Sequence, residues 1–349
     1  MKKFIKKLSS AFLLTALTLS AAGCGGANDE GQEGVQENEG VAEEQKIEKV
    51  RMASWSQPIV EQSNLYLAEE KGWFEEAGLE FEYIPGAGGG DAVRNIIAGN
   101  ADIAFANVEA ILLALEQGEE LRVIYNIYPK NVFNLVSLKE SNIQTMEDLR
   151  GKDVGVYSLA SGTYQNLLVL LHQAGMTKED VNIVEAGVLN FGPLMNHQVV
   201  ATAATDTGLF DAKQKGLGEV DVIEVKDVLN TPADVFVVTE KVFQEKQDML
   251  IRFLQVYRDS VAYTMEHPEE AAEAAVATAI DGQDVERNVE IIKIRNQTST
   301  NEDMKEKGLG WLDLEILKEV ESTYYDLGLL NDRVNIDQIT TNELVQQLR

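Results

Sequence analysis

Residues 153–174 read DVGVYSLASGTYQNLLVLLHQA, and they determine the fold class of this chain. The stretch predicts a strand at Asp153–Tyr157, a loop of small residues at Ser158–Thr163, and a helix at Tyr164–Ala174. A strand, a loop and a helix of these lengths form the repeating unit of a parallel sheet that is covered by helices. We therefore predict an α/β fold.

Strands and helices alternate on both sides of this stretch. The further predicted strands are Val50–Ser54, Leu79–Ile84, Asp102–Ala106 and Leu121–Tyr125 upstream, and Val181–Glu185, Val199–Ala204 and Val220–Val225 downstream. Two apolar runs, Val132–Leu138 and Val235–Thr239, flank the downstream group, and we predict that they are crossing strands that join two lobes. From Lys241 onward the pattern is almost entirely helical. The predicted domains are lobe 1 at 48–135, lobe 2 at 136–236, and a return to lobe 1 with C-terminal helices at 237–349.

Composition narrows the function classes. The 349 residues carry a formal net charge of −28, which disfavours a nucleic-acid partner because phosphate binding relies on Lys and Arg. The chain has one cysteine and three histidines, so we predict no internal disulfide, no metal site and no cofactor. We place no catalytic residue, because nothing brings a nucleophile, a base and an acid together.

The N-terminus explains the single cysteine. Residues 1–23 combine four lysines, a short apolar run and small residues, which is typical of a secretory signal peptide. The end of this segment, LSAAGC at 19–24, resembles a bacterial lipobox, although alanine stands where leucine is commoner, so we predict lipidation at Cys24. The alternative is an ordinary signal peptide followed by a chance cysteine. Residues 24–47 are acidic and nearly free of apolar side chains, which predicts a disordered tether.

Four phrases carry a resemblance to a known family. They are NLYLAEEKGWFEEAGL at 64–79, GNAD at 99–102, MEDLRGK at 146–152 and EHPEEA at 266–271. In this order they resemble the periplasmic-binding-protein family, in its nitrate, sulfonate, taurine and thiamine-pyrimidine precursor branch. The resemblance implies a bilobed type II fold with two parallel-sheet lobes, which closes on one small molecule and docks on the transmembrane subunits of an ABC permease.

Ligands of open α/β sheets bind beyond the carboxyl ends of the strands. Five loops of this sequence lie there: 54–57, 86–91, 107–109, 158–163 and 205–207. From these loops and the residues next to them we predict the ligand-binding set Trp55, Ser56, Gln57, Gly88, Gly89, Asn107, Glu109, Ser158, Ser161, Gly162, Thr163, Tyr164, Phe191, Asp206 and Thr207.

Most of these residues also have a purely structural interpretation. Ser161-Gly162-Thr163 offers hydroxyls and N–H donors to a ligand, but it is equally a common helix N-cap. Gly88 and Gly89 lie in a glycine-rich turn that lacks the fingerprint of a nucleotide loop. Trp55 stacks on a ligand ring or fills the core. Tyr164 and Phe191 have the same two options, and core packing is the more common one.

Two acidic residues guide the choice of ligand. If Glu109 and Asp206 face the cleft, they accept hydrogen bonds from an amino-bearing ring and repel an oxyanion such as a sulfonate. The five loops hold no Lys and no Arg. Both features favour a nitrogenous heteroaromatic ligand that resembles a thiamine-pyrimidine precursor.

We therefore predict a monomeric, lipid-anchored receptor on the extracytoplasmic face of the cell membrane that is not an enzyme. It hands its ligand to an ABC permease. The alternatives are the same receptor role for an alkanesulfonate, taurine or nitrate, an extracellular sensor subunit, and an anchored enzyme acting on a pyrimidine-like molecule. Fungal and plant pyrimidine synthases related to this fold carry a cysteine-rich motif, which this chain lacks.

Overall fold

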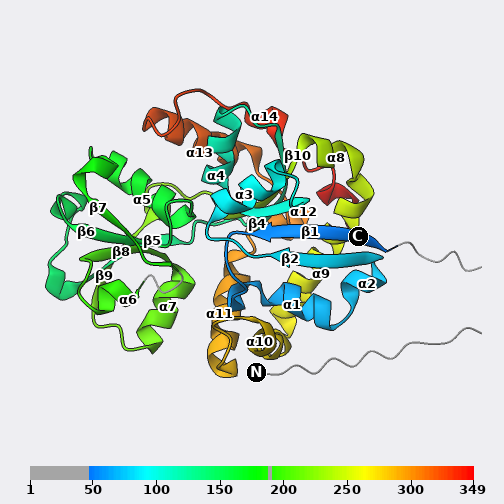
Figure 1. The fold of residues 1–349 in the computed structure, drawn as a ribbon, viewed down its shortest axis with the longest axis horizontal. Coiled ribbons are helices and arrows are strands. Elements are labelled where there is room, and N and C mark those ends of the chain that lie inside the picture. The colour runs from blue at the N-terminus through cyan, green and yellow to red at the C-terminus, as the bar shows by residue number, and fades with distance from the viewer. Residues whose placement is uncertain (1–46, 188–190) are drawn as a thin grey trace, which may run out of the picture. The chain divides into compact units, whose positions relative to one another are not determined.

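The computed structural model describes residues 47–187 and 191–349, and these residues build two five-stranded sheets (Figure 1). The first sheet has the strand order β2-β1-β3-β10-β4, with β1 (Glu48–Ser54), β2 (Leu79–Ile84), β3 (Ile103–Asn107), β4 (Leu121–Tyr128) and β10 (Asp234–Thr239). The second has the order β7-β6-β8-β5-β9, with β5 (Phe133–Leu138), β6 (Asp153–Val156), β7 (Asn182–Glu185), β8 (Ala201–Thr205) and β9 (Val220–Glu224). We call the body around the first sheet lobe 1 and the body around the second lobe 2.

Each sheet is mixed, whereas the sequence predicts parallel sheets. In lobe 1, β10 runs antiparallel to its neighbours β3 and β4. In lobe 2, β5 runs antiparallel to β8 and β9. Both strands follow a crossing between the lobes. The chain therefore enters each sheet from the side of the cleft, where the parallel strands have their carboxyl ends, and the entering strand runs antiparallel to them. The predicted α/β bilobed fold is confirmed, with this correction to strand direction.

The two crossing segments lie between β4 and β5 and between residue 227 and β10. They are joined where they pass, because Ala233 N–H donates to the Tyr128 carbonyl at 2.8 Å. Asn131 links both crossings to lobe 2: its amide donates to the Leu229 carbonyl and to Asn166 Oδ1, at 3.0 Å each. The sequence places the crossings within Val132–Leu138 and Val235–Thr239, which in the structure are strands of one sheet each.

The helices that follow the strands cover the sheets. They are α1 (Ser63–Glu70), α2 (Trp73–Glu76), α3 (Gly89–Ile97) and α4 (Val108–Glu116) in lobe 1, and α5 (Gly162–Gln173), α6 (Gly192–Met195) and α7 (Asp206–Gln214) in lobe 2. Side chains of β10 alternate between the two faces of the lobe 1 sheet. Phe236 packs in the aromatic core with Phe253 and Tyr257 of α9 (Gln247–Glu266), while Val235 and Val237 face the core of α3 and α4.

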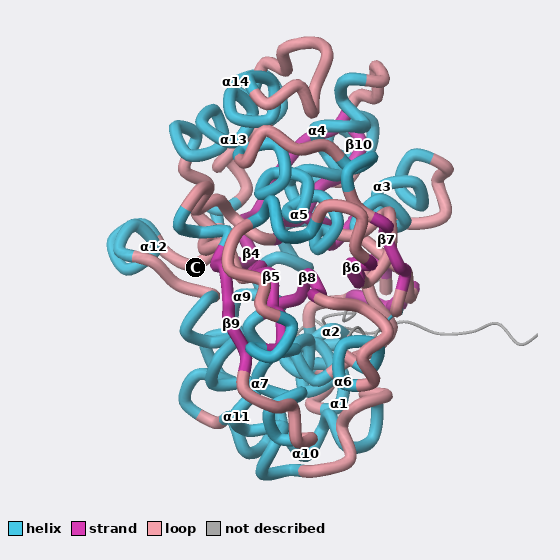
Figure 2. Tube along the Cα trace, turned by 90° about the vertical axis from the view of Figure 1, so that its left-hand side faces the viewer, coloured by secondary structure: helices cyan, strands magenta, loops and turns pink. Residues whose placement is uncertain are grey.

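The C-terminal part is helical, as predicted. It contains α8 (Glu240–Glu245), α9 (Gln247–Glu266), α10 (Pro268–Thr278), α11 (Val285–Thr298), α12 (Glu302–Lys307), α13 (Leu314–Asp326) and α14 (Ile336–Ile339). Helix α11 packs on α10 and α9 of lobe 1, and its other side contacts α7 of lobe 2. Figure 2 looks onto the lobe 2 sheet and again shows α7 beside α11. This helix therefore brings side chains of the C-terminal part to the boundary between the lobes.

No helix within the described ranges has the length and apolar character needed to cross a bilayer. The predicted signal peptide, the Cys24 lipidation site and nearly all of the predicted tether fall in residues 1–46, outside the described residues.

Candidate functional site

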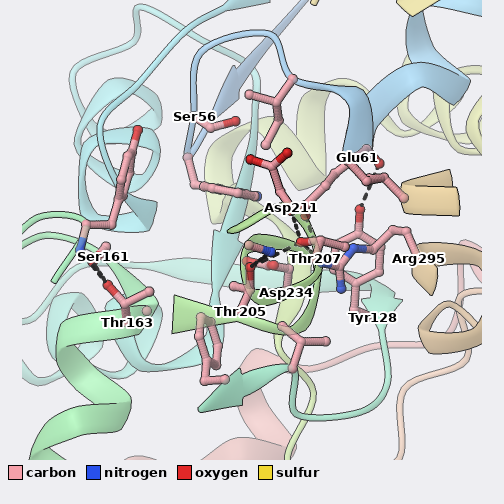
Figure 3. A pocket seen from close by; sticks show the side chains of 18 of the residues that line it. Ser56, Glu61, Tyr128, Ser161, Thr163, Thr205, Thr207, Asp211, Asp234 and Arg295 are labelled. Atoms are coloured by element: carbon pink, nitrogen blue, oxygen red, sulfur yellow. Dashed lines mark hydrogen bonds and ion pairs between the residues drawn. The ribbon is translucent and has the colours of Figure 1, made fainter. Parts of the chain in front are cut away.

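A cleft between the lobes encloses about 1040 Å³ of space, part of it open to solvent (Figure 3). All five predicted loops reach it. The predicted residues that line the cleft are Trp55, Ser56, Gly88, Gly89, Asn107, Ser161, Gly162, Thr163 and Thr207.

The other predicted residues lie outside the lining of the cleft. Gln57 is exposed, and Tyr164 packs half-buried against the core. Phe191 is buried in a small lobe 2 core. Ser158 hydroxyl donates across the lobes to the Ala87 carbonyl. Glu109 and Asp206 bind other protein groups, as described below.

Aromatic rings from both lobes form the walls. The Trp55 ring lies edge-to-face with Phe105 at 6.5 Å and with Tyr157 of lobe 2 at 6.3 Å between centroids. The Trp55 Nε1 atom is buried and has no hydrogen-bond partner in the described chain. Tyr128 and Phe133, which flank the first crossing, also line the cleft. Flat apolar walls of this kind suit a planar ligand.

The loop before α5 has the predicted N-cap role and also lines the cleft. Ser161 is the N-cap of α5, and its Oγ lies 2.7 Å from Thr163 Oγ1, which in turn accepts the Tyr157 N–H at 3.0 Å. The hydroxyls are therefore used locally, although the loop lines the cleft. Gly162 is required at its position, because a Cβ there would lie 2.5 Å from the Phe133 ring.

Glu109 is fully buried, and its carboxylate is occupied by amides from both lobes. Asn107 Nδ2 donates to one oxygen at 2.8 Å, and Asn166 Nδ2 of α5 donates to the other at 3.0 Å. Burial raises the pKa of Glu109, and the Asn107 hydrogen bond offsets only part of this rise. The expectation that Glu109 faces the cleft is not met, because both of its oxygens point into this interlobe network.

Arg295 of α11 is the centre of an ionic cluster between the lobes. Its Nη2 atom lies 2.9 Å from Glu61 of lobe 1 and 3.0 Å from Asp206 at the start of α7 in lobe 2. The same nitrogen donates to Thr207 Oγ1 at 2.9 Å, and Thr207 donates to Glu61. Burial alone would lower the pKa of Arg295, but Asp206 and Glu61 outweigh it and raise this pKa. The guanidinium also lies over the Tyr128 ring at 4.8 Å.

A second ion pair joins the same helices. Arg287 of α11 binds Asp211 of α7 and also lies 3.3 Å from Asp281 of lobe 1. Lys215 is paired with Asp211 at 2.7 Å. Every Lys and Arg in the lining therefore has a carboxylate partner within the protein.

These cations correct the expectation of a cleft without Arg or Lys. Arg287, Arg295 and Lys215 all line it. Sequence reasoning missed them because Arg287 and Arg295 lie inside α11 and Lys215 lies at the end of α7, rather than in loops after strands. The helical pattern of α11 also gives no sign of which side faces lobe 2.

Asp234, the first residue of β10, is the other residue that the sequence missed. It lines the cleft and is 6% exposed, and its side chain makes no hydrogen bond with residues 47–187 or 191–349. Burial raises the pKa of Asp234 to about 8, and Arg295 counteracts this only in part. The sequence did not indicate it, because ligands are expected beyond the carboxyl ends of parallel strands. Strand β10 is antiparallel, so it is its first residue that lies at the cleft.

Backbone contacts also connect the lobes. The Gly90 N–H donates to the Ala160 carbonyl at 3.0 Å. Together with the two ion pairs on α11, this contact shows that the lobes meet on both sides of the cleft. The described residues hold no group of three or more His, Cys, Asp or Glu side chains placed to bind a metal.

The two lobes, their crossing segments and the cleft between them define the periplasmic-binding-protein fold. A model of the family described as "NMT1/THI5 like" matches residues 60–271, and the chain belongs to this family. A solved structure of the alkanesulfonate-binding protein SsuA from Xanthomonas axonopodis pv. citri, bound to MOPS, has a TM-score of 0.66 at 14% identity, and covers 84% of this chain and 98% of that one.

Curated relatives are similar over long stretches. The riboflavin-binding protein RibY of Chloroflexus aurantiacus is 24% identical over 306 residues, which are 86% of each chain. A putative thiamine biosynthesis protein of Haemophilus influenzae is 27% identical over 216 residues, which are 61% of this chain and 68% of that protein.

The raised pKa of Asp234 predicts a pH-dependent cost to stability. In the unfolded chain its pKa is about 3.9, so the cost is absent below pH 4 and grows as the pH rises towards 8. We expect the gain in unfolding free energy of Asp234→Asn over the wild type to increase by about 4 kcal/mol between pH 5 and pH 8. Urea unfolding at both pH values measures it.

The control is Asp221→Asn, which changes an exposed carboxylate on β9. The difference in unfolding free energy between Asp221→Asn and the wild type should stay constant from pH 5 to pH 8. If the difference in unfolding free energy between Asp234→Asn and the wild type is also constant, the Asp234 carboxyl is already ionised at pH 5, which would contradict its raised pKa.

Proposed function

We propose that this protein is the extracytoplasmic solute-binding receptor of an ABC importer. It captures one small ligand between its lobes and delivers it to the permease. Family membership and a cleft that is lined from both lobes support this role. A ligand that contacts both lobes stabilises the closed arrangement because it makes all of its contacts only there. The Cys24 anchor would keep the receptor at the membrane.

We further propose a nitrogenous heteroaromatic ligand, of which a thiamine-pyrimidine precursor is one example. The observation that carries this choice is the state of the charges in the cleft. Arg287, Arg295 and Lys215 are each neutralised by protein carboxylates, while the carboxyl of Asp234 has no partner. A nitrogen-bearing ring complements that carboxyl and stacks on the aromatic walls.

An alkanesulfonate, taurine or nitrate is the second candidate. The observation in its favour is that arginines line the cleft, and an oxyanion is a natural partner of arginine. It would have to displace Glu61 or Asp206 from Arg295, which leaves a carboxylate buried without its cation. Because breaking a buried ion pair costs about 3–5 kcal/mol, we rank this candidate lower.

Calorimetric titration tests the proposed function. We expect 4-amino-5-hydroxymethyl-2-methylpyrimidine or riboflavin to bind and to raise the melting temperature, by mass action on the folded state. Taurine, an alkanesulfonate and nitrate should leave it unchanged. Mass spectrometry after incubation should recover the ligand unaltered. Binding of the sulfonate alone would reverse the choice of ligand, and a ligand of altered mass would indicate an enzyme.

Alanine substitutions at Gly88 and Gly90 test whether the lobes must close for the ligand to bind. A Cβ on Gly88 would lie 2.5 Å from the Ala160 carbonyl oxygen of lobe 2, so Gly88→Ala should hold the lobes apart and weaken binding at least about tenfold. With saturating ligand, small-angle X-ray scattering should give a larger radius of gyration than for the wild type.

The control is Gly90→Ala, whose added Cβ would lie 3.4 Å from Ala160 and needs no unusual backbone conformation. Its affinity should stay within about threefold of the wild type. Equal affinities for the two variants would contradict closure as the basis of binding.

A further inference from the structure

Asp234 occupies an unusual position for a carboxyl group. It starts a strand whose next residues, Val235 and Phe236, are completely buried, and it is itself 6% exposed. A buried polar group without a hydrogen bond destabilises a protein, and such groups are rare in native structures. Since no group of the described residues bonds to this side chain, its carboxyl is available to a group that enters the cleft.

The surroundings of Asp234 do not supply a partner. The positive charge of Arg295 lowers the pKa of Asp234, but the Nη2 atom of Arg295 already binds Glu61, Asp206 and Thr207. Glu61 and Glu109 add two further acidic groups. Opposite Asp234 on β3 is Asn107, whose Nδ2 donates to Glu109. Figure 3 shows Asp234 among the lining side chains near Thr205.

We propose that the Asp234 carboxyl determines ligand specificity by pairing with a ring edge on which one carbon separates an N–H donor from an acceptor. This inference rests on the proposed function, since it assigns the chemistry of the same cleft. A carboxyl group also spans two oxygens across one carbon, so it makes two parallel hydrogen bonds with such an edge, provided that its proton is on it or on the ring.

Two kinds of ring have this edge. In a 4-aminopyrimidine the amine donates to one oxygen and the ring nitrogen accepts from the other. In the cyclic imide of a flavin the ring N–H donates and the adjacent carbonyl accepts. The pKa of about 8 leaves Asp234 largely protonated at neutral pH, which provides the donor that both edges need. A sulfonate or nitrate has only acceptors and negative charge, so Asp234 also disfavours these ions.

Two variants test the hydrogen bonds of this side chain. Asp234→Asn keeps one donor and one acceptor, and Asp234→Leu removes both. The probes are two matched pairs in which methyl groups replace the hydrogens on the nitrogen: 4-amino-5-hydroxymethyl-2-methylpyrimidine with its 4-dimethylamino analogue, and riboflavin with 3-methylriboflavin. Asp221→Asn is the control for loss of one acidic side chain. Dissociation constants come from calorimetric titration at pH 7.

For the ring system that binds, we expect the wild type to prefer the N–H compound at least about tenfold over its methylated partner. Asp234→Asn and Asp221→Asn should bind the N–H compound within about fivefold of the wild type. Asp234→Leu should lose at least about tenfold while its ligand-free melting temperature stays level or rises, because a structural role for Asp234 would lower that temperature.

Wild-type affinity in Asp234→Leu would overturn this inference and leave the proposed function standing. Equal losses of affinity in Asp234→Asn and Asp234→Leu would overturn it as well, because the Asn amide keeps the donor and the acceptor that pair with the ring edge. Failure of both ring systems to bind the wild type, with binding of an alkanesulfonate, would overturn the proposed function too.

Discussion

The neutralisation of Arg295 is the constraint on which the arrangement of the lobes depends. This guanidinium is 3% exposed, and a buried arginine cannot lose its proton, so it must have carboxylates beside it. Glu61 comes from lobe 1 and Asp206 from lobe 2. The closed cleft is therefore partly held by the protein's own charges. The contact of Arg295 with Glu61 lies within lobe 1, whereas its contacts with Asp206 and Thr207 join the two lobes.

The crossing of the chain between the lobes determines what the cleft contains. Each crossing ends in a strand that starts at the cleft and runs away from it, which places Phe133 of β5 and Asp234 of β10 in the lining. The parallel strands deliver loops and helix starts to the same place. A wall of the cleft therefore consists of strand beginnings in addition to the loops that follow strands.

Much of the fold could be predicted from sequence because its signals are local. Strand-to-helix alternation, the helix after Ser161-Gly162-Thr163 and the C-terminal helices all depend on patterns within about twenty residues. The predicted loops do line the cleft. Strand direction could not be predicted, since it depends on where the chain re-enters each sheet. The same limit hid Asp234. Arg287 and Arg295 were hidden because only the packing of α11 against α7 turns them towards lobe 2. Glu109 and Asp206 were expected to face a ligand, but they bind Asn166 and Arg295 instead.

A cleft whose cations are all paired with carboxylates, and in which the Asp234 carboxyl has no hydrogen-bond partner among the described residues, is suited to a ring that donates hydrogen bonds. Native mass spectrometry of the full chain, purified from cells without refolding, tests this account most directly. We predict a one-to-one complex with a nitrogenous heteroaromatic molecule that is released unchanged on denaturation. A bound sulfonate, nitrate or other oxyanion at the same stoichiometry would contradict it.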